Sequence, residues 1–405
     1  MKRFSMKKWL CSGLRGLCRF RQYDDTFRPS PMSRRACTRP TSRRMPPWRA
    51  GLATLTVAVL ASTACTGSGP TDLEEAVGHV ARPDTVRGLY VNALAAGSPT
   101  QLGSLLGLAN TSPVNTFVVD VKERGEVSYA SSVPLVAAIG SGRTYIGDLP
   151  GLLRTLLDHG IYPIARIVCF QDPILAEAHP DWAIRTTAGG VWLDPESHRP
   201  WVDPHNPEVW AYNIALAREA LTAGFAEVQW DYVRFPDVTD SVRATMVFPA
   251  RGGRSAPAAI QEFIATSRVA LAEFQAPITA DVFGRVIVET GDSDIGQDWD
   301  QLVRLTDVLL PMVYPALWGP GNFGLPDPNA EPYRLVRAAM DSAVVRMSRT
   351  AGAVATIRPW LQAFTQGSTV YGAQEIRDQI RAVTDAGLDE WLLWNAGSVY
   401  PAGIF

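Results

Sequence analysis

Several residue types that often carry chemistry are scarce in this chain of 405 residues. Five cysteines occur, but four of them lie within the first 65 residues, so that only Cys169 remains beyond that point. A single cysteine cannot form an intramolecular disulfide or supply a thiolate metal site. After Lys8 the only lysine is Lys122, and the other basic side chains of the body are therefore arginines.

Motifs for three large enzyme classes are absent as well. The five histidines form no HxH, HxxxH or HExxH pattern, which argues against a zinc hydrolase or a metal-dependent deacetylase. Without a GxSxG sequence the chain lacks the nucleophile elbow of an α/β-hydrolase. No GxGxxG or Walker sequence supports nucleotide chemistry. The sequence therefore predicts neither a metal nor a cofactor.

Charge is distributed unevenly along the chain. Residues 1–64 hold 14 of the 38 lysines and arginines but only 2 of the 40 acidic residues. The rest of the chain holds 24 basic and 38 acidic side chains, a net charge near −14. Such an acidic body argues against nucleic acid as a partner and suits a neutral or cationic substrate.

A short apolar run, residues 50–64, follows the basic stretch and ends in small residues just before Cys65. The run is too short to cross a bilayer comfortably and is typical of a secretory signal. Small residues directly before a cysteine resemble a bacterial lipoprotein processing site, although Ser62 stands where leucine is usual. We expect residues 1–64 to be a basic extension with a signal peptide, Cys65 to be lipidated and residues 65–84 to be a tether. The protein is then exported, as a membrane lipoprotein or, after ordinary signal cleavage, as a secreted protein.

Eight short runs rich in β-branched and aromatic residues recur along the body, and most are separated by a stretch long enough for a helix. One such helix, residues 209–222, is preceded by Asn206 and Pro207 and closed by Gly224, which are typical start and stop signals. Further helices are expected over residues 150–159, 257–274, 331–347 and 373–386. This alternation predicts a (β/α)8 TIM barrel in residues 85–405, with its chemistry at the C-terminal ends of the strands. The runs are Val86–Asn92, Thr116–Lys122, Tyr162–Phe170, Glu227–Phe235, Ile278–Gly284, Asp307–Pro315, Arg358–Thr365 and Glu390–Ala396.

Three of these runs carry an aspartate near their C-terminal ends: Asp120, Asp231 and Asp281. A carboxylate inside an apolar strand is costly to bury unless it is paired or used. We predict that Asp231 is a catalytic carboxylate that attacks or stabilises an oxocarbenium ion, and that Asp281 on the next strand is the acid/base. The alternatives are structural: Asp231 pairs with Arg166 or Arg234, and Asp281 pairs with an arginine or caps the following helix.

Polar and aromatic residues near other strand ends predict contacts with substrate. Asp120 and Lys122 are expected to bind sugar hydroxyls or to tune the acid, with an Asp–Lys pair inside the barrel as the alternative. Glu123 is a second candidate for the acid. Arginine and amide side chains bind sugar hydroxyls, and flat aromatic faces stack on a pyranose ring. The other predicted contacts are Arg166, Tyr314, Gln362 and Trp394.

Three long loops, residues 171–205, 236–255 and 318–329, leave C-terminal strand ends. Loops of this length in a compact domain are usually functional or disordered. They contain four tryptophans, and an exposed aromatic side chain in such a loop is typical of recognition. These tryptophans are Trp182, Trp192, Trp201 and Trp318.

Several stretches, taken in order between residues 85 and 402, carry a family resemblance. They include VRGLYVN (86–92), FVVDVKERGEVSY (117–129), YPIARIVCFQDP (162–173), VQWDYVRFP (228–236) and ITADVFG (278–284). The chain resembles a bacterial family of glycoside hydrolases with a TIM-barrel fold, often exported or attached to the membrane.

The resemblance implies a barrel of the glycosidase superfamily. Asp231 also resembles the nucleophile position of the α-amylase and α-galactosidase superfamilies, and Asp281 stands on the strand that carries the acid in the α-amylase group. The α-galactosidase group has its acid on strand six, where residues 311–315 (PMVYP) contain none.

The sequence thus predicts an exported glycoside hydrolase that cleaves a cell-surface or environmental polysaccharide with paired carboxylates. Its partner is a carbohydrate, and the mechanism needs no cofactor. One alternative is a catalytically inactive glycan-binding surface lipoprotein on the same barrel. Another is an envelope protein without a sugar ligand.

Overall fold

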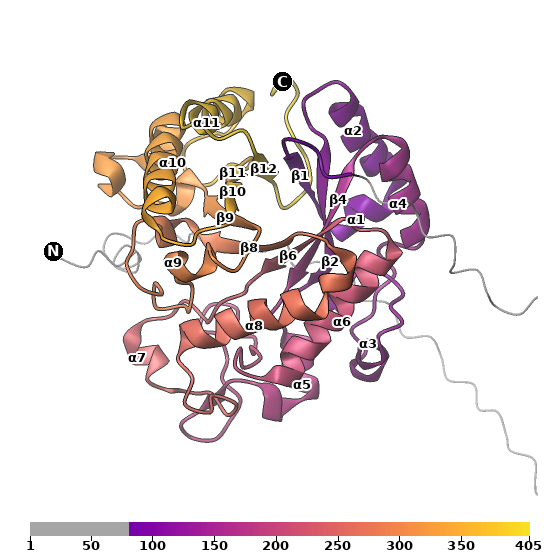
Figure 1. The fold of residues 1–405 in the computed structure, drawn as a ribbon, viewed down its shortest axis with the longest axis vertical. Coiled ribbons are helices and arrows are strands. Elements are labelled where there is room, and N and C mark those ends of the chain that lie inside the picture. Colours follow the sequence, from indigo (N-terminus) through magenta and orange to yellow (C-terminus); the bar gives the residue numbers. More distant parts are fainter. Residues whose placement is uncertain (1–80) are drawn as a thin grey trace, which may run out of the picture. The chain divides into compact units, whose positions relative to one another are not determined.

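Eight parallel strands form a closed barrel in this computed structural model, which describes residues 81–405 (Figure 1). The predicted signal segment, Cys65 and most of the predicted tether lie outside the described residues. The barrel is closed because β1 pairs with both β2 and β12. Its strands are β1 (Arg87–Val91), β2 (Thr116–Glu123), β4 (Tyr162–Val168), β6 (Glu227–Asp231), β8 (Ile278–Phe283), β9 (Val308–Val313), β11 (Trp360–Gln362) and β12 (Trp391–Trp394). Each matches one predicted run, and the predicted TIM barrel is confirmed.

The seventh barrel strand is built from two pieces. The short strand β10 (Thr356–Ile357) pairs with β9, and β11 then pairs with both β9 and β12. Pro359 lies between the two pieces, and a proline has no backbone N–H to donate to a neighbouring strand. The ladder is therefore interrupted just before β11.

Helices surround the strands, and the predicted ones are present as α4, α6, α8, α10 and α11 (Figure 1). The Asn206 side chain accepts from the backbone N–H of Glu208 at the start of α6, and Gly224 ends that helix with φ 120°. No helix in residues 81–405 is long and apolar enough to cross a membrane. The helices are α1 (Ala93–Gly97), α2 (Pro99–Asn110), α3 (Pro134–Ile139), α4 (Leu149–Asp158), α5 (Pro173–Ala178), α6 (Pro207–Ala223), α7 (Asp240–Arg243), α8 (Ala256–Ala270), α9 (Trp299–Leu302), α10 (Pro332–Arg349) and α11 (Ala373–Asp385).

The long loops have structure of their own. In an antiparallel pair, β5 (Arg185–Thr186) joins β7 (Met246–Val247), so that the loops after β4 and β6 are held together. A further short strand, β3 (Glu126–Val127), folds back on β2. Single 3-10 turns are η2 (Pro180–Trp182), η3 (Ala272–Phe274), η4 (Gly284–Ile287), η5 (Pro315–Leu317), η6 (Asn322–Gly324) and η7 (Pro328–Ala330).

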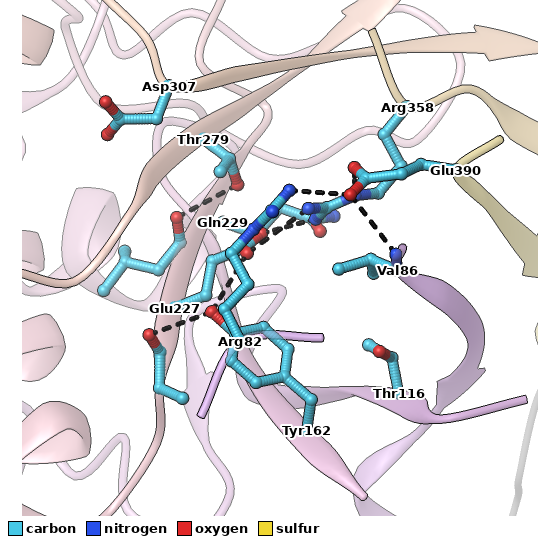
Figure 2. Close-up of polar contacts among 12 residues, drawn as sticks. Arg82, Val86, Thr116, Tyr162, Glu227, Gln229, Thr279, Asp307, Arg358 and Glu390 are labelled. Carbon is cyan, nitrogen blue, oxygen red and sulfur yellow. Dashed lines mark hydrogen bonds and ion pairs between the residues drawn. The ribbon is translucent and has the colours of Figure 1, made fainter. Parts of the chain in front are cut away.

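An ion network around the buried Arg358 and Glu227 lies at the N-terminal end of the barrel (Figure 2). Arg358 donates to Glu227 at 2.6 Å and to Glu390 at 2.9 Å, and Arg82 donates to Glu390 at 2.6 Å. The hydroxyl of Tyr162 also donates to Glu227, at 3.4 Å. Contacts with the barrel therefore begin at Arg82, slightly before the predicted domain start at residue 85.

Candidate active site

The guanidinium of Arg166, on β4, connects three carboxylates at the C-terminal end of the barrel. Its Nη1 donates to Asp120 at 2.5 Å and to Glu123 at 2.7 Å. Its Nε and Nη2 both donate to Asp231 Oδ2, at 3.0 and 2.6 Å. Burial lowers the pKa of this guanidinium, but the carboxylates outweigh burial and leave the pKa well above its ordinary value. Arg166 therefore stays charged and holds Asp120 and Asp231 side by side.

Asp231 is the last residue of β6, and hydrogen-bond donors surround its carboxylate. Besides the two N–H groups of Arg166 at Oδ2, the backbone N–H of Tyr232 donates to Oδ1 at 2.6 Å. Tyr232 has φ 48°, in the left-handed region that side chains other than glycine seldom adopt. Strained residues of this kind cluster at functional sites. The turn stabilises the charge on Asp231 and ends β6 earlier than the predicted run.

Asp281, on β8, lies in a different environment. The amide of Gln229 donates to both of its oxygens at 3.0 Å, and the indole N–H of Trp360 donates to Oδ1 at 2.8 Å. Burial, followed by the charge of Asp231, raises the pKa of Asp281 well above its ordinary value. One carboxyl group paired with a cation and a neighbouring one whose pKa is raised are an arrangement suited to acid/base catalysis.

Asp120 is the third buried carboxyl group of the site. It accepts from the Tyr90 hydroxyl at 2.5 Å as well as from Arg166. Burial raises the pKa of Asp120 to about 7, with Arg166 opposing the rise and Glu123 adding to it. The Tyr90 ring stacks on Trp394 at 3.9 Å between centroids, and Arg166 lies over both rings. The predicted residues Asp120, Arg166 and Trp394 are thus together.

Lys122 is not part of this cluster. A bulge in β2 pairs Asp120 with Arg166 and Lys122 with the very next residue of β4, Ile167, so that Lys122 moves to the outer face of the barrel. There it is fully buried, 2.7 Å from Asp172 and 2.8 Å from Asn213. The alternative of an Asp120–Lys122 pair inside the barrel is therefore wrong.

The other predicted contacts differ in how accessible they are. Tyr314 is buried near the two catalytic candidates, since burial and then the charges of Asp281 and Asp231 raise the pKa of its hydroxyl. Gln362 is fully buried, accepting from the backbone of Ala316 and donating to that of Phe364. Its side chain joins two loops in this structure.

Three site residues were not predicted: Tyr90, Gln229 and Trp360. Gln229 and Trp360 each stand two positions before a predicted residue of the same run, Asp231 and Gln362. Side chains two positions apart in a strand point to the same face. This spacing in the sequence indicates that Gln229 and Trp360 point into the barrel, as Asp231 and Gln362 were predicted to do.

The loop tryptophans do not present a common binding surface. Trp192, Trp201 and Trp318 are buried, and the half-buried Trp182 stacks on His179 at 4.2 Å. The expectation of exposed aromatic side chains is wrong for these three, because the paired loops after β4 and β6 and the loop after β9 bury them. In residues 81–405, no group of three or more His, Cys, Asp or Glu side chains is arranged to hold a metal ion.

Solved structures resemble the chain in fold. The glycoside hydrolase domain of PgaB (BpsB) from Bordetella bronchiseptica aligns with a TM-score of 0.53 at 11% identity, over 78% of this chain and 95% of that domain. A hypothetical protein from Ruminiclostridium thermocellum is 36% identical over 48% of this chain and 97% of its own, with a TM-score of 0.43. Among curated proteins, none matches the sequence. Residues 88–400 match the family described as "Putative glycosyl hydrolase domain", and the chain therefore belongs to this family of glycoside hydrolases.

Proposed function

We propose that this glycoside hydrolase cleaves a polysaccharide of the cell surface or environment, with Asp231 and Asp281 as its catalytic pair. The single observation that carries the proposal is the contrast between the two carboxyl groups. Asp231 accepts from the Arg166 cation and from the backbone N–H of Tyr232, whereas within residues 81–405 Asp281 accepts only from the uncharged Gln229 and Trp360. Burial and the charge of Asp231 also raise the pKa of Asp281, which favours its protonated form. They stand on the adjacent strands β6 and β8.

In the proposed reaction, Asp281 gives its proton to the glycosidic oxygen as the C–O bond breaks. Asp231 attacks the anomeric carbon or stabilises its positive charge. Water then supplies the hydroxyl group on that carbon, and its second proton returns to the acid/base. Arg166 orients Asp231, and the reaction uses only side chains of this chain and water.

Purified wild type, Asp231→Asn and Asp281→Asn can be incubated with a panel of polysaccharides and cell-wall glycans. We expect new oligosaccharides, detected by mass spectrometry, from the wild type alone. Binding of one glycan without any products from the wild type would favour the inactive glycan-binding protein instead.

The role of Asp281 has a sharper test. A leaving group that needs no proton, such as a nitrophenolate, makes general acid catalysis unnecessary. Asp281→Asn should therefore lose much less activity on a nitrophenyl glycoside than on the polysaccharide, whereas Asp231→Asn should lose activity on both. Glu123, the second candidate for the acid, is one-third exposed, and Glu123→Gln serves as the matched variant. If Glu123→Gln and not Asp281→Asn shows the selective loss, Glu123 is the acid.

We also propose that the protein is exported and anchored by a lipid at Cys65. The support is the short apolar run and the small residues before this cysteine. Wild type and Cys65→Ala can be compared in cells fed a labelled fatty acid. Label in the membrane-bound wild type but not in the variant is expected, and equal labelling would contradict the anchor.

A further inference from the structure

Three arginines are buried in the part of the chain that the structure describes, and only two of them are neutralised. Arg166 has three carboxylates, and Arg358 has Glu227 and Glu390 (Figure 2). The third, Arg234, is 8% exposed and forms no ion pair with any residue from 81 to 405. A buried charge without a partner is costly, so Arg234 calls for an explanation.

Aromatic rings surround the guanidinium of Arg234. Its central carbon lies 4.4 Å from the ring centroid of Phe283, 4.8 Å from that of Tyr232 and 5.1 Å from that of Trp201. Rings attract a cation through their faces but leave the N–H groups in the plane of the guanidinium unused. Burial accordingly lowers the pKa of Arg234, whereas the pKa values of Arg166 and Arg358 are raised.

Most of the donors of Arg234 are free. Its single hydrogen bond runs from Nη1 to the carbonyl of Phe235 at 2.9 Å. Nε and Nη2 donate to no residue from 81 to 405, and neither atom is fully enclosed by the protein. One edge of the guanidinium is therefore available for a bidentate contact with an oxyanion.

Arg234 also lies beside the proposed catalytic pair. Tyr232, one of its three rings, directly follows Asp231 and donates its backbone N–H to that carboxylate. Phe283, the closest ring, stands two residues after Asp281. The charge of Asp237 and, to a smaller extent, that of Asp231 act on the Arg234 guanidinium.

We propose that Arg234 recognises an anionic substituent of the substrate, either the carboxylate of a uronic acid or a sulfate or phosphate ester. The inference rests on the proposed glycosidase site and names its substrate class: an acidic glycan. This substrate class differs from the neutral or cationic substrate expected from net charge. A buried arginine interacts with a substrate in direct contact, whereas solvent screens the interaction of the substrate with the net charge of the protein.

Arg285 provides a matched control. It also lies over the Phe283 ring, at 5.2 Å, but its guanidinium donates to Asp237 at 2.8 and 3.1 Å. Its charge is therefore already neutralised. Arg285→Gln alone would remove a cation from Asp237, whose charge also acts on Arg234. The control is therefore the double variant Arg285→Gln/Asp237→Asn, which perturbs the same aromatic ring and keeps the donor edge of Arg234.

Calorimetric titration at fixed ionic strength tests the proposal with glucuronate, glucose and inorganic sulfate as probes. Wild type should bind glucuronate or sulfate at least about tenfold more tightly than glucose. A hydrogen bond between two charged groups strengthens binding by about this factor over one to a neutral group. Arg234→Gln should lower the affinity for the favoured anion by about tenfold to a hundredfold and leave the affinity for glucose unchanged. Arg285→Gln/Asp237→Asn should bind the anion at least as tightly as wild type does. Preference between glucuronate and sulfate distinguishes a uronic acid from an ester.

The proposal is overturned if wild type does not prefer an anion, or if Arg234→Gln binds it as wild type does. Should Arg234→Gln fail to fold, Arg234→Lys keeps the charge but loses the planar fork. It should then show an intermediate affinity, and unchanged affinity would again overturn the proposal. The titration measures binding and does not depend on catalysis. If Asp231 and Asp281 proved not to be the catalytic pair, the binding result for Arg234 would still stand.

Discussion

Replacing Arg166 with glutamine should destabilise the protein more at high pH than at low pH. The substitution removes four hydrogen bonds and leaves Asp120 and Asp231 buried without a cation. Breaking a buried ion pair from one side costs about 3–5 kcal/mol. Glu123 is one-third exposed and adds little, because solvent screens its charge.

The pH dependence follows from Asp120. Its pKa is already about 7 in the folded protein, and Arg166 is the group that holds it down. A carboxyl group whose folded pKa lies above its unfolded value stabilises the fold while protonated, and this contribution is lost as pH rises through the folded pKa. Without Arg166 the pKa of Asp120 rises further. The substitution therefore lowers the free energy of unfolding more at pH 8 than at pH 5.

Urea unfolding followed by tryptophan fluorescence at pH 5 and pH 8 measures this difference. Asp120→Asn in the Arg166→Gln background removes the titrating group and should recover part of the loss at pH 8 only. An equal loss at both pH values, or no recovery in the double variant, would refute the electrostatic reasoning.

Two further predictions concern Asp120 and Lys122. Activity should decline as pH rises through about 7, because the charge of ionised Asp120 offsets that of Arg166 and weakens its attraction for Asp231. A kcat/KM profile of Asp120→Asn should lack this decline. An unchanged profile would remove Asp120 from the catalytic network. Lys122→Met should lower the free energy of unfolding by about 3–5 kcal/mol, since Asp172 is left buried without its cation. Its pH profile of activity, measured below the melting temperature, should match wild type, and a shifted profile would mean that Lys122 reaches the site.

The strands were predictable because barrel strands are buried on both faces and read as apolar, β-branched runs. The C-terminal positions of Asp120, Asp231 and Asp281 followed from the same pattern. Most helices were marked by local signals, such as the proline and glycine around α6. Helix α2 was not predicted, although Ser98 and Pro99 supply a cap and a first-turn proline.

Local backbone irregularities were not predictable from alternation. The bulge after Asp120 turns Lys122 outward, and the left-handed turn at Tyr232 ends β6 and changes the direction of the residues that follow. Alternation along an uninterrupted strand would place Arg234 on the face opposite to Asp231. In the structure it lies instead in an aromatic cage beside the site.

The central claim is that Asp231 carries out glycoside hydrolysis. The most direct test compares product release by wild type and Asp231→Asn on the glycan that the wild type cleaves. We expect a loss of at least about a thousandfold, the order seen when one member of a catalytic group is removed. Thermal melting of the two proteins shows whether the variant is folded. A folded Asp231→Asn variant with full activity would contradict the assignment.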